Sequence, residues 1–279
     1  MAALSVAQYE LVYNAFSFTI ATMGAATLFF WFGRSQVSDR YKTALTITGL
    51  VTAIALYHYV RILQSWDASY DVVNGQITAT GVTFNHAYRY VDWLLTVPLL
   101  LIELILVMGL SRPETWSKGV RLGLLAAVMV ILGYPGEISG NPSTRWMWWA
   151  LAMVPFMWIV YELFVGLGDA IAKQSEDVRR LVDTARWLTV ISWSFYPVVF
   201  VFPMMGLTGG SAATAVEVGY TIADIVAKAV FGVIIYTWIG DFGMSVVGAG
   251  IWFRVGSARR CRPKIAQASH FARPTGRGV

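Results

Sequence analysis

Apolar residues gather in seven stretches along the chain, at about 10–33, 43–65, 84–110, 118–135, 143–167, 184–205 and 216–248. Most of these stretches reach the ~20 residues that a helix needs to cross a bilayer. The composition agrees, because 57% of the residues are hydrophobic and 13% are charged, whereas soluble domains carry about 25% charged residues. The pattern therefore predicts an all-α membrane protein built as a bundle of seven transmembrane helices.

Residues 67–82, between the second and third stretches, follow a different pattern. Asn74-Gly75 stands between Val72-Val73 and Gln76-Ile77. Asn-Gly between β-forming residues is typical of a tight hairpin turn. We therefore predict a short extracellular β-hairpin between helices two and three.

The basic residues of the loops are distributed unevenly between the two ends of the predicted helices. The loops 66–82, 136–142 and 206–215 contain no lysine or arginine. The other loops and the tail carry Arg34, Arg40, Lys42, Arg112, Lys118, Arg121, Lys173, Arg179, Arg180, Arg186, Arg254, Arg259, Arg260, Arg262 and Lys264. The positive-inside rule then predicts an amino terminus outside the cell and a cytoplasmic carboxyl terminus, and seven crossings require opposite ends.

The charge and cysteine content limit the other classes of function. We expect one seven-helix domain over residues 1–250 and a solvated, partly disordered cytoplasmic tail over 251–279. The net charge of +5 follows from this topology, and no nucleic-acid partner is predicted. The single Cys261 excludes an intrachain disulfide, and His58, His86 and His270 are scattered, so no metal site is predicted.

Lys228 lies inside the seventh apolar stretch, with Asp224 four residues before it. A lysine at membrane depth is costly and marks a candidate functional site, and the i, i+4 spacing puts both side chains on one helical face. A buried structural ion pair is one interpretation. The other is a reactive amine that forms a Schiff base with an aldehyde, whose positive charge needs a nearby carboxylate.

The third stretch carries Arg89, Asp92, Thr96 and Glu103 at spacings of three, four and seven residues. These spacings keep all four side chains on one helical stripe. Chains of acidic groups inside a membrane are typical of proton relays. His58, on the second stretch, is either bonded to a neighbouring helix or tunes Asp92, since histidine titrates near neutral pH.

Two further features predict a cavity between the helices. Pro98, Pro155 and Pro197 fall inside predicted helices, where membrane proteins tolerate proline at the expense of a bend. An aromatic stripe on the sixth stretch is either ordinary helix packing or, together with Trp93, one wall of a slot for a long, flat, apolar ligand. Its members are Trp193, Tyr196, Pro197 and Phe200.

The chain resembles the microbial (type 1) rhodopsins, and specifically the proton pumps of the proteorhodopsin and xanthorhodopsin group. The resemblance covers residues 8–250 and is carried by four long motifs. They are Tyr13-Asn14-Ala15-Phe16-Ser17-Phe18, Arg89-Tyr90-Val91-Asp92-Trp93-Leu94-Leu95-Thr96-Val97-Pro98, Gly133-Tyr134-Pro135-Gly136-Glu137-Ile138-Ser139 and Val218-Gly219-Tyr220-Thr221-Ile222-Ala223-Asp224.

The resemblance implies a light-driven outward proton pump and a role for each matched residue. Lys228 would hold all-trans retinal as a protonated Schiff base, Asp92 would be the main counterion and proton acceptor, and Asp224 the second counterion. Thr96 would complete the pump pattern, with Glu103 as the cytoplasmic proton donor. The remaining matches are His58 as partner of Asp92, Arg89 beneath the counterions, Trp93, Trp193, Tyr196 and Pro197 as the retinal box, and Leu100 as the position that favours green absorption.

Rival members of the family differ at the same positions. A chloride pump would have no carboxylate at position 92. A sodium pump would carry Asn-Asp-Gln where this chain has Asp92, Thr96 and Glu103. A sensory rhodopsin photoreceptor is the remaining alternative, since sensors keep the acceptor but often lose the donor, and Glu103 favours a pump.

Several expectations concern the surroundings of the site. Trp149 stands where some xanthorhodopsin-type pumps carry a glycine that opens a window for an antenna carotenoid, so no such carotenoid is expected. Glu217 and Glu137 are carboxylates near the outer side, and the resemblance does not assign the proton-release group. It further implies a homo-oligomer, a pentamer or trimer, in a bacterial inner membrane.

Overall fold

The computed structural model describes residues 3–240, and the predicted tail over 251–279 lies outside the described residues. Seven helical segments in this part of the chain are long and apolar enough to cross a membrane, which confirms the predicted architecture. The elements are α1 (Val6–Gly33), η1 (Arg34–Gln36), η2 (Asp39–Tyr41), α2 (Lys42–Ser69), α3 (Ala87–Met108), α4 (Arg112–Glu137), α5 (Pro142–Tyr161), η3 (Glu162–Gly166), α6 (Gly168–Ala172), α7 (Glu176–Val201), η4 (Phe202–Met205), α8 (Gly210–Asp224), η5 (Ile225–Val230) and α9 (Phe231–Ile239).

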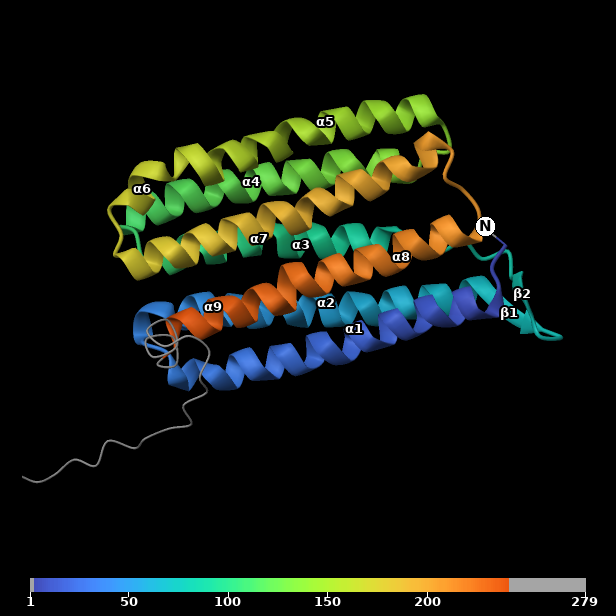
Figure 1. The fold of residues 1–279 in the computed structure, drawn as a ribbon, viewed down its shortest axis with the longest axis horizontal. Helices are drawn as coiled ribbons and strands as arrows, with labels where there is room; N and C mark the ends of the chain where they lie inside the picture. The colour runs from blue at the N-terminus through green and yellow to red at the C-terminus, as the bar shows by residue number, and fades with distance from the viewer. Residues whose placement is uncertain (1–2, 241–279) are drawn as a thin grey trace, which may run out of the picture.

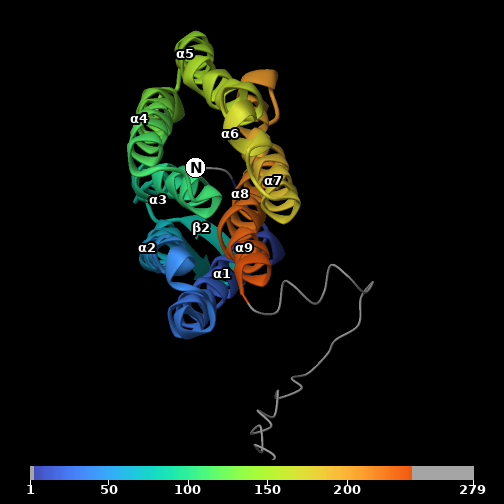
Figure 2. The same cartoon turned by 90° about the vertical axis from the view of Figure 1, so that its left-hand side faces the viewer.

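The helices form one layered bundle in which sequence neighbours pack side by side (Figure 1). Seen from the end in Figure 2, the helices form a ring in the order α1, α2, α3, α4, α5, α7 and α8, and α8 packs against α1. Across the ring, α3 also contacts α7. The third helix therefore contacts helices from both halves of the chain. Its central position explains why buried polar groups collect on it.

A two-stranded antiparallel sheet projects from one end of the bundle, which we call the hairpin end (Figure 1). It consists of β1 (Tyr70–Val73) and β2 (Gln76–Ala79). Asn74 and Gly75 have φ of 53° and 75°, the left-handed values that a two-residue hairpin turn requires. The predicted hairpin is confirmed, and Tyr70 anchors it by packing into a cluster of buried aromatic and aliphatic side chains.

Some helices are longer than the apolar pattern predicted. α4 begins at Arg112 rather than near 118, because the Ser111 side chain and Glu114 form a capping box ahead of the apolar run. α7 begins at Glu176 rather than near 184. Hydropathy detects the part of a helix that lies in lipid, whereas the helix itself continues for one or two polar turns beyond it.

Close helix packing at the end opposite the hairpin depends on a glycine of α9. A Cβ at Gly232 would stand 2.5 Å from atoms of both Phe30 on α1 and Thr48 on α2. Only a residue without a side chain allows α9 to lie this close to both helices. The contact also fixes the position of Thr48, which belongs to the site described next.

Candidate functional site

Lys228 lies in the middle of the bundle, on the π-helical segment η5 that interrupts the last membrane-spanning helix. Its side chain is buried, and its Nζ contacts two carboxylates. It donates a hydrogen bond to Asp92 Oδ2 from α3 and lies 3.1 Å from Asp224 Oδ1, one turn earlier on its own helix. The structure thus brings together the lysine and both acids that the sequence predicted.

The two carboxylates differ in how fully they are hydrogen-bonded. Asp224 accepts hydrogen bonds from Tyr59 Oη at 2.7 Å, Tyr196 Oη at 2.7 Å and Trp93 Nε1 at 3.1 Å. Asp92 Oδ1 is buried and has no hydrogen-bond partner among residues 3–240. Donors favour the charged form of an acid, so Asp224 is suited to stay ionised and Asp92 has an oxygen free to receive a proton.

His58 and Thr96 lie next to Asp92, but neither donates to its carboxylate. His58 Nδ1 is 3.9 Å from Asp92 Oδ1, beyond hydrogen-bond range, and 2.9 Å from the Ile54 carbonyl oxygen of its own helix. The Thr96 hydroxyl donates to the backbone carbonyl of Asp92 at 2.8 Å. Both side chains therefore lie near Asp92, as predicted, but each forms its hydrogen bond with a backbone carbonyl of its own helix.

Glu103 occupies a separate buried position toward the end opposite the hairpin. The Thr48 hydroxyl lies 2.6 Å from its Oε1, and its Oε2 has no partner within the described part of the chain. No cation among the described residues forms an ion pair with it. An ionised carboxylate without a partner is costly to bury, so this site suits a protonated acid. The helical rise puts Glu103 roughly 16 Å along the axis from Asp92.

A cavity beside Lys228 is walled mainly by apolar and aromatic side chains. It is lined by every side chain predicted to touch a ligand, namely Trp93, Leu100, Trp193, Tyr196, Pro197, Phe200 and Lys228. Lys228 is the only lysine that lines it within the described chain, its amine is paired with Asp224, and most of the other lining side chains are apolar or aromatic. These residues fit a long apolar aldehyde that condenses with the amine.

Sequence reasoning missed the wall contributed by α4 and α5. Met129 and Gly133 from α4 and Met153 and Phe156 from α5 line the same cavity. Nothing in the local sequence distinguishes these residues from ordinary membrane-facing side chains. Tyr59 was missed as well, although a tyrosine next to His58 in an apolar stretch could have been recognised as a donor.

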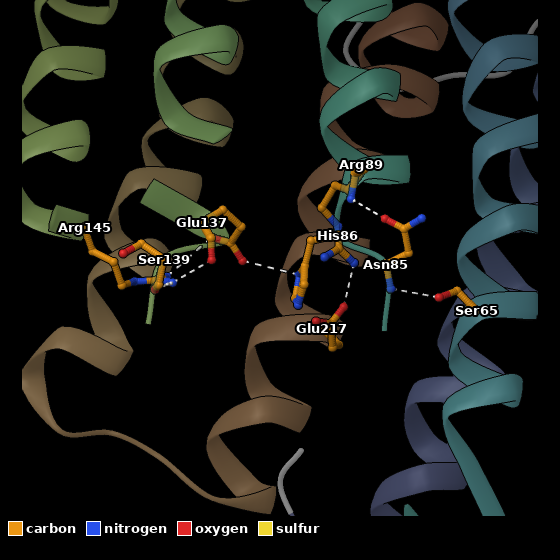
Figure 3. A network of polar contacts seen from close by, with 9 residues as sticks. Ser65, Asn85, His86, Arg89, Glu137, Ser139, Arg145 and Glu217 are labelled. Atoms are coloured by element: carbon orange, nitrogen blue, oxygen red, sulfur yellow. Dashed lines mark hydrogen bonds and ion pairs between the residues drawn. The ribbon is translucent and has the colours of Figure 1, made fainter. Parts of the chain in front are cut away.

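Between the cavity and the hairpin end lies a second polar group, shown in Figure 3. Arg89 Nη2 donates to Glu217 Oε2 at 2.6 Å, and both side chains are buried. The guanidinium carbon also lies 4.9 Å from the centre of the Tyr220 ring. Arg89 lies on the hairpin side of Asp92, the side on which a residue beneath the counterions was expected, whereas its pairing with Glu217 was not predicted.

The family described as bacteriorhodopsin-like protein matches residues 11–241. The green-light absorbing proteorhodopsin of Gamma-proteobacterium EBAC31A08 is 32% identical over 227 residues, which are 80% of this chain and 85% of that protein. Bacteriorhodopsin of Halobacterium salinarum is 31% identical over 233 residues, 80% of this chain and 82% of that protein.

Solved structures agree with these relatives. The crystal structure of xanthorhodopsin, described as a light-driven ion pump with dual chromophore, superposes with a TM-score of 0.81 at 49% identity, covering 86% of this chain and 96% of that one. The crystal structure of a thermophilic rhodopsin gives a TM-score of 0.82 at 41% identity, with the same coverage of 86% and 96%.

Proposed function

The chain belongs to the bacteriorhodopsin-like family, as a microbial rhodopsin of the proteorhodopsin and xanthorhodopsin group, and from this premise we propose that it pumps protons outward when illuminated. As in its relatives, the activity is light-driven ion transport and not enzymatic catalysis. The observation that carries the proposal is the arrangement around Lys228. One buried amine lies between two acids, and of these only Asp92 has an oxygen without a hydrogen-bond partner among the described residues.

Retinal is the cofactor of this family, and the cavity residues fit it. All-trans retinal, joined to Lys228 Nζ as a protonated Schiff base, would supply light absorption and a light-driven change in the proton affinity of that nitrogen. Trp93, Trp193, Tyr196, Pro197 and Phe200 would hold it by aromatic and aliphatic contact. Leu100, also in the wall, supports absorption of green light.

Asp92 is the proton acceptor in this proposal, and Asp224 is the permanent counterion. Lys228 Nζ already contacts Asp92 Oδ2, so a proton has a hydrogen bond along which to move. Three donors hold the Asp224 charge in place, and a proton there would weaken the hydrogen bonds that they make to the carboxylate. His58 and Arg89 would adjust the electrostatic environment of Asp92 from either side, and Thr96 would hold the helix backbone beside it.

Glu103 is the proposed donor that returns a proton to the Lys228 nitrogen. Its burial, its single Thr48 contact and its position on the stripe of Asp92 support this role. The Glu103→Gln variant should therefore form the pigment normally and release its first proton at the normal rate. The pigment should then return to its dark state about tenfold more slowly or slower still.

Flash spectroscopy of the pigment's recovery measures this effect directly. Glu162→Gln is a matched control, because Glu162 is also a buried membrane carboxylate but pairs with Arg121 outside the cavity. Recovery of Glu103→Gln at the normal rate would remove Glu103 from the relay.

Orientation decides the direction of transport, and the charge distribution supports an outward pump. The basic loop residues of the described chain, such as Arg40, Lys118 and Lys173, lie at the end opposite the hairpin, which the positive-inside rule assigns to the cytoplasm. Glu103 would then face the cytoplasm, and the hairpin and amino terminus the outside. The location in a bacterial inner membrane is a prediction. So is the trimeric or pentameric homo-oligomer, whose mass can be measured in mild detergent.

Trp149 bears on whether a second chromophore binds. The xanthorhodopsin structure is described as having a dual chromophore. In this chain the Trp149 indole lines the cavity and donates to the Pro197 carbonyl at 3.0 Å, so its ring occupies the wall between α5 and α7. We expect that adding a carotenoid to the pigment transfers no excitation to retinal; a carotenoid band in the excitation spectrum would contradict this.

The deciding experiment is the light-induced pH change of cells that express the chain with all-trans retinal. Acidification of the medium that a protonophore abolishes is expected from an outward proton pump. Alkalinisation would reverse the proposed orientation. A visible pigment without any pH change would favour a sensory rhodopsin, in which Lys228 binds retinal but the relay is not used for transport.

A further inference from the structure

The polar stripe of α3 continues beyond Arg89 to a histidine at the hairpin end. His86 precedes the first residue of α3, three residues before Arg89 and six before Asp92. The exposed fraction of the side chain rises along this series, from 1% at Asp92 and 3% at Arg89 to 37% at His86. His86 is therefore the first ionisable group on the stripe that reaches the medium on this side.

His86 faces a carboxylate on a neighbouring helix, as Figure 3 shows. Its Nδ1 lies 3.4 Å from Oε1 of Glu137, near the end of α4, whose side chain is 11% exposed. That nitrogen is itself buried and has no hydrogen-bond partner within residues 3–240. The imidazole thus has one shielded nitrogen directed at an acid while part of its ring is in contact with solvent.

Arg145 on α5 fixes the other side of Glu137. Its Nη2 lies 3.4 Å from Glu137 Oε2, and its Nη1 donates to the Glu137 backbone carbonyl at 2.8 Å. The guanidinium carbon packs 4.7 Å from the centre of the Phe200 ring, next to the cavity wall. Arg145 therefore holds Oε2 of the Glu137 carboxylate, and Oε1 is directed toward His86.

Glu217, the other acid at this end, is placed differently. Its side chain is 6% exposed and is bound by Arg89 Nη2 at 2.6 Å. A buried, directly paired carboxylate is a poor site from which to deliver a proton to water, because protonating it breaks the pair and leaves Arg89 buried without its partner. Among residues 3–240, the charged groups near His86 in Figure 3 are Glu137, Arg145, Arg89 and Glu217, and of these four Glu137 is the one that faces its ring nitrogen.

We propose that His86 and Glu137 form the release site through which the proton leaving Asp92 reaches the medium at the hairpin end. This proposal rests on the proposed pump function and names a step within it. Asp92 gives up its proton and returns to the carboxylate form, the His86–Glu137 pair takes the proton up, and the exposed imidazole passes it to water or buffer. Histidine suits this task because one ring nitrogen can take up a proton while the other gives one up.

The test follows the proton after a light flash in nanodiscs that hold the full chain with retinal, using a water-soluble pH dye. His86→Gln and Glu137→Gln should each delay the appearance of the proton in the medium by at least about tenfold. The loss of the proton from the Lys228 nitrogen, followed by visible absorption, should keep its rate. Added imidazole should restore fast release in His86→Gln, which a merely structural loss would not allow.

Glu10→Gln is the control, because Glu10 is an exposed carboxylate at the same end on α1, away from the network. Normal release times in both His86→Gln and Glu137→Gln would overturn the proposal, as would an equal delay in the Glu10 control. The absence of any light-induced proton signal from the unaltered protein would instead contradict the pump function itself. The two failures are therefore distinguishable.

Discussion

Lys228→Ala should yield a chain that inserts into the membrane but forms no covalent pigment with all-trans retinal. Lys228 is the only lysine among the residues that line the described cavity, and no other side chain there can form a Schiff base with an aldehyde. The visible absorption band should disappear completely. Absorbance after acid denaturation tests whether any remaining retinal is covalently bound.

Lys118→Ala is the matched control for this variant. Lys118 lies at the end opposite the hairpin, where its Nζ donates to the Gly166 carbonyl at 3.2 Å, and its loss should leave the pigment intact. A covalent visible pigment in Lys228→Ala would contradict the proposed attachment site. Loss of pigment in both variants would point to a folding defect, which the helix content from circular dichroism would reveal.

Asp92→Asn should keep a retinal pigment but reduce light-driven acidification by roughly a hundredfold or more, the range expected for loss of a positioned proton acceptor. Asparagine occupies nearly the same volume but cannot take up the proton from the Lys228 nitrogen. Asp224 is a poor substitute because its oxygens already accept three hydrogen bonds. The measurement is the initial rate of the pH change per amount of pigment.

Glu162→Gln controls for the loss of a buried membrane carboxylate away from the cavity, and it should pump at the normal rate. If Asp92→Asn pumped at more than about 5% of the normal rate per amount of pigment, Asp224 would be shown to accept the proton. In that case, removing a donor to Asp224 with Tyr59→Phe should alter the residual rate, since the Tyr59 hydroxyl is one of its three partners.

The prediction for Asp92→Asn depends on a difference between two aspartates that their positions in the hydropathy pattern do not show. Each lies in an apolar stretch, each was predicted to be near Lys228, and each contacts it in the structure. The difference comes from Tyr59, 165 positions away from Asp224 in the chain, and from Tyr196 and Trp93. Hydrogen-bond donors contributed by three other helices decide which acid is free to react.

The sequence by itself determined the architecture and the chemical inventory of this protein. A bilayer requires about 20 apolar residues per crossing, so seven spans could be counted directly, and Asn74-Gly75 identified the hairpin turn. Charged groups are costly in a membrane, so Lys228, Asp92, Asp224 and Glu103 stood out without structural help. Helix ends were predicted less well, since the polar first turns of α4 and α7 carry no hydrophobic signal.

Only the tertiary structure decided which of these groups meet, and on which sides. The pairing of Arg89 with Glu217 joins positions 128 residues apart, and His86 with Glu137 joins the ends of α3 and α4. The cavity wall from α4 and α5 consists of side chains that resemble lipid-facing ones in the sequence. Periodicity describes one helix at a time, whereas these contacts depend on the rotation and spacing of separate helices, which close packing alone sets.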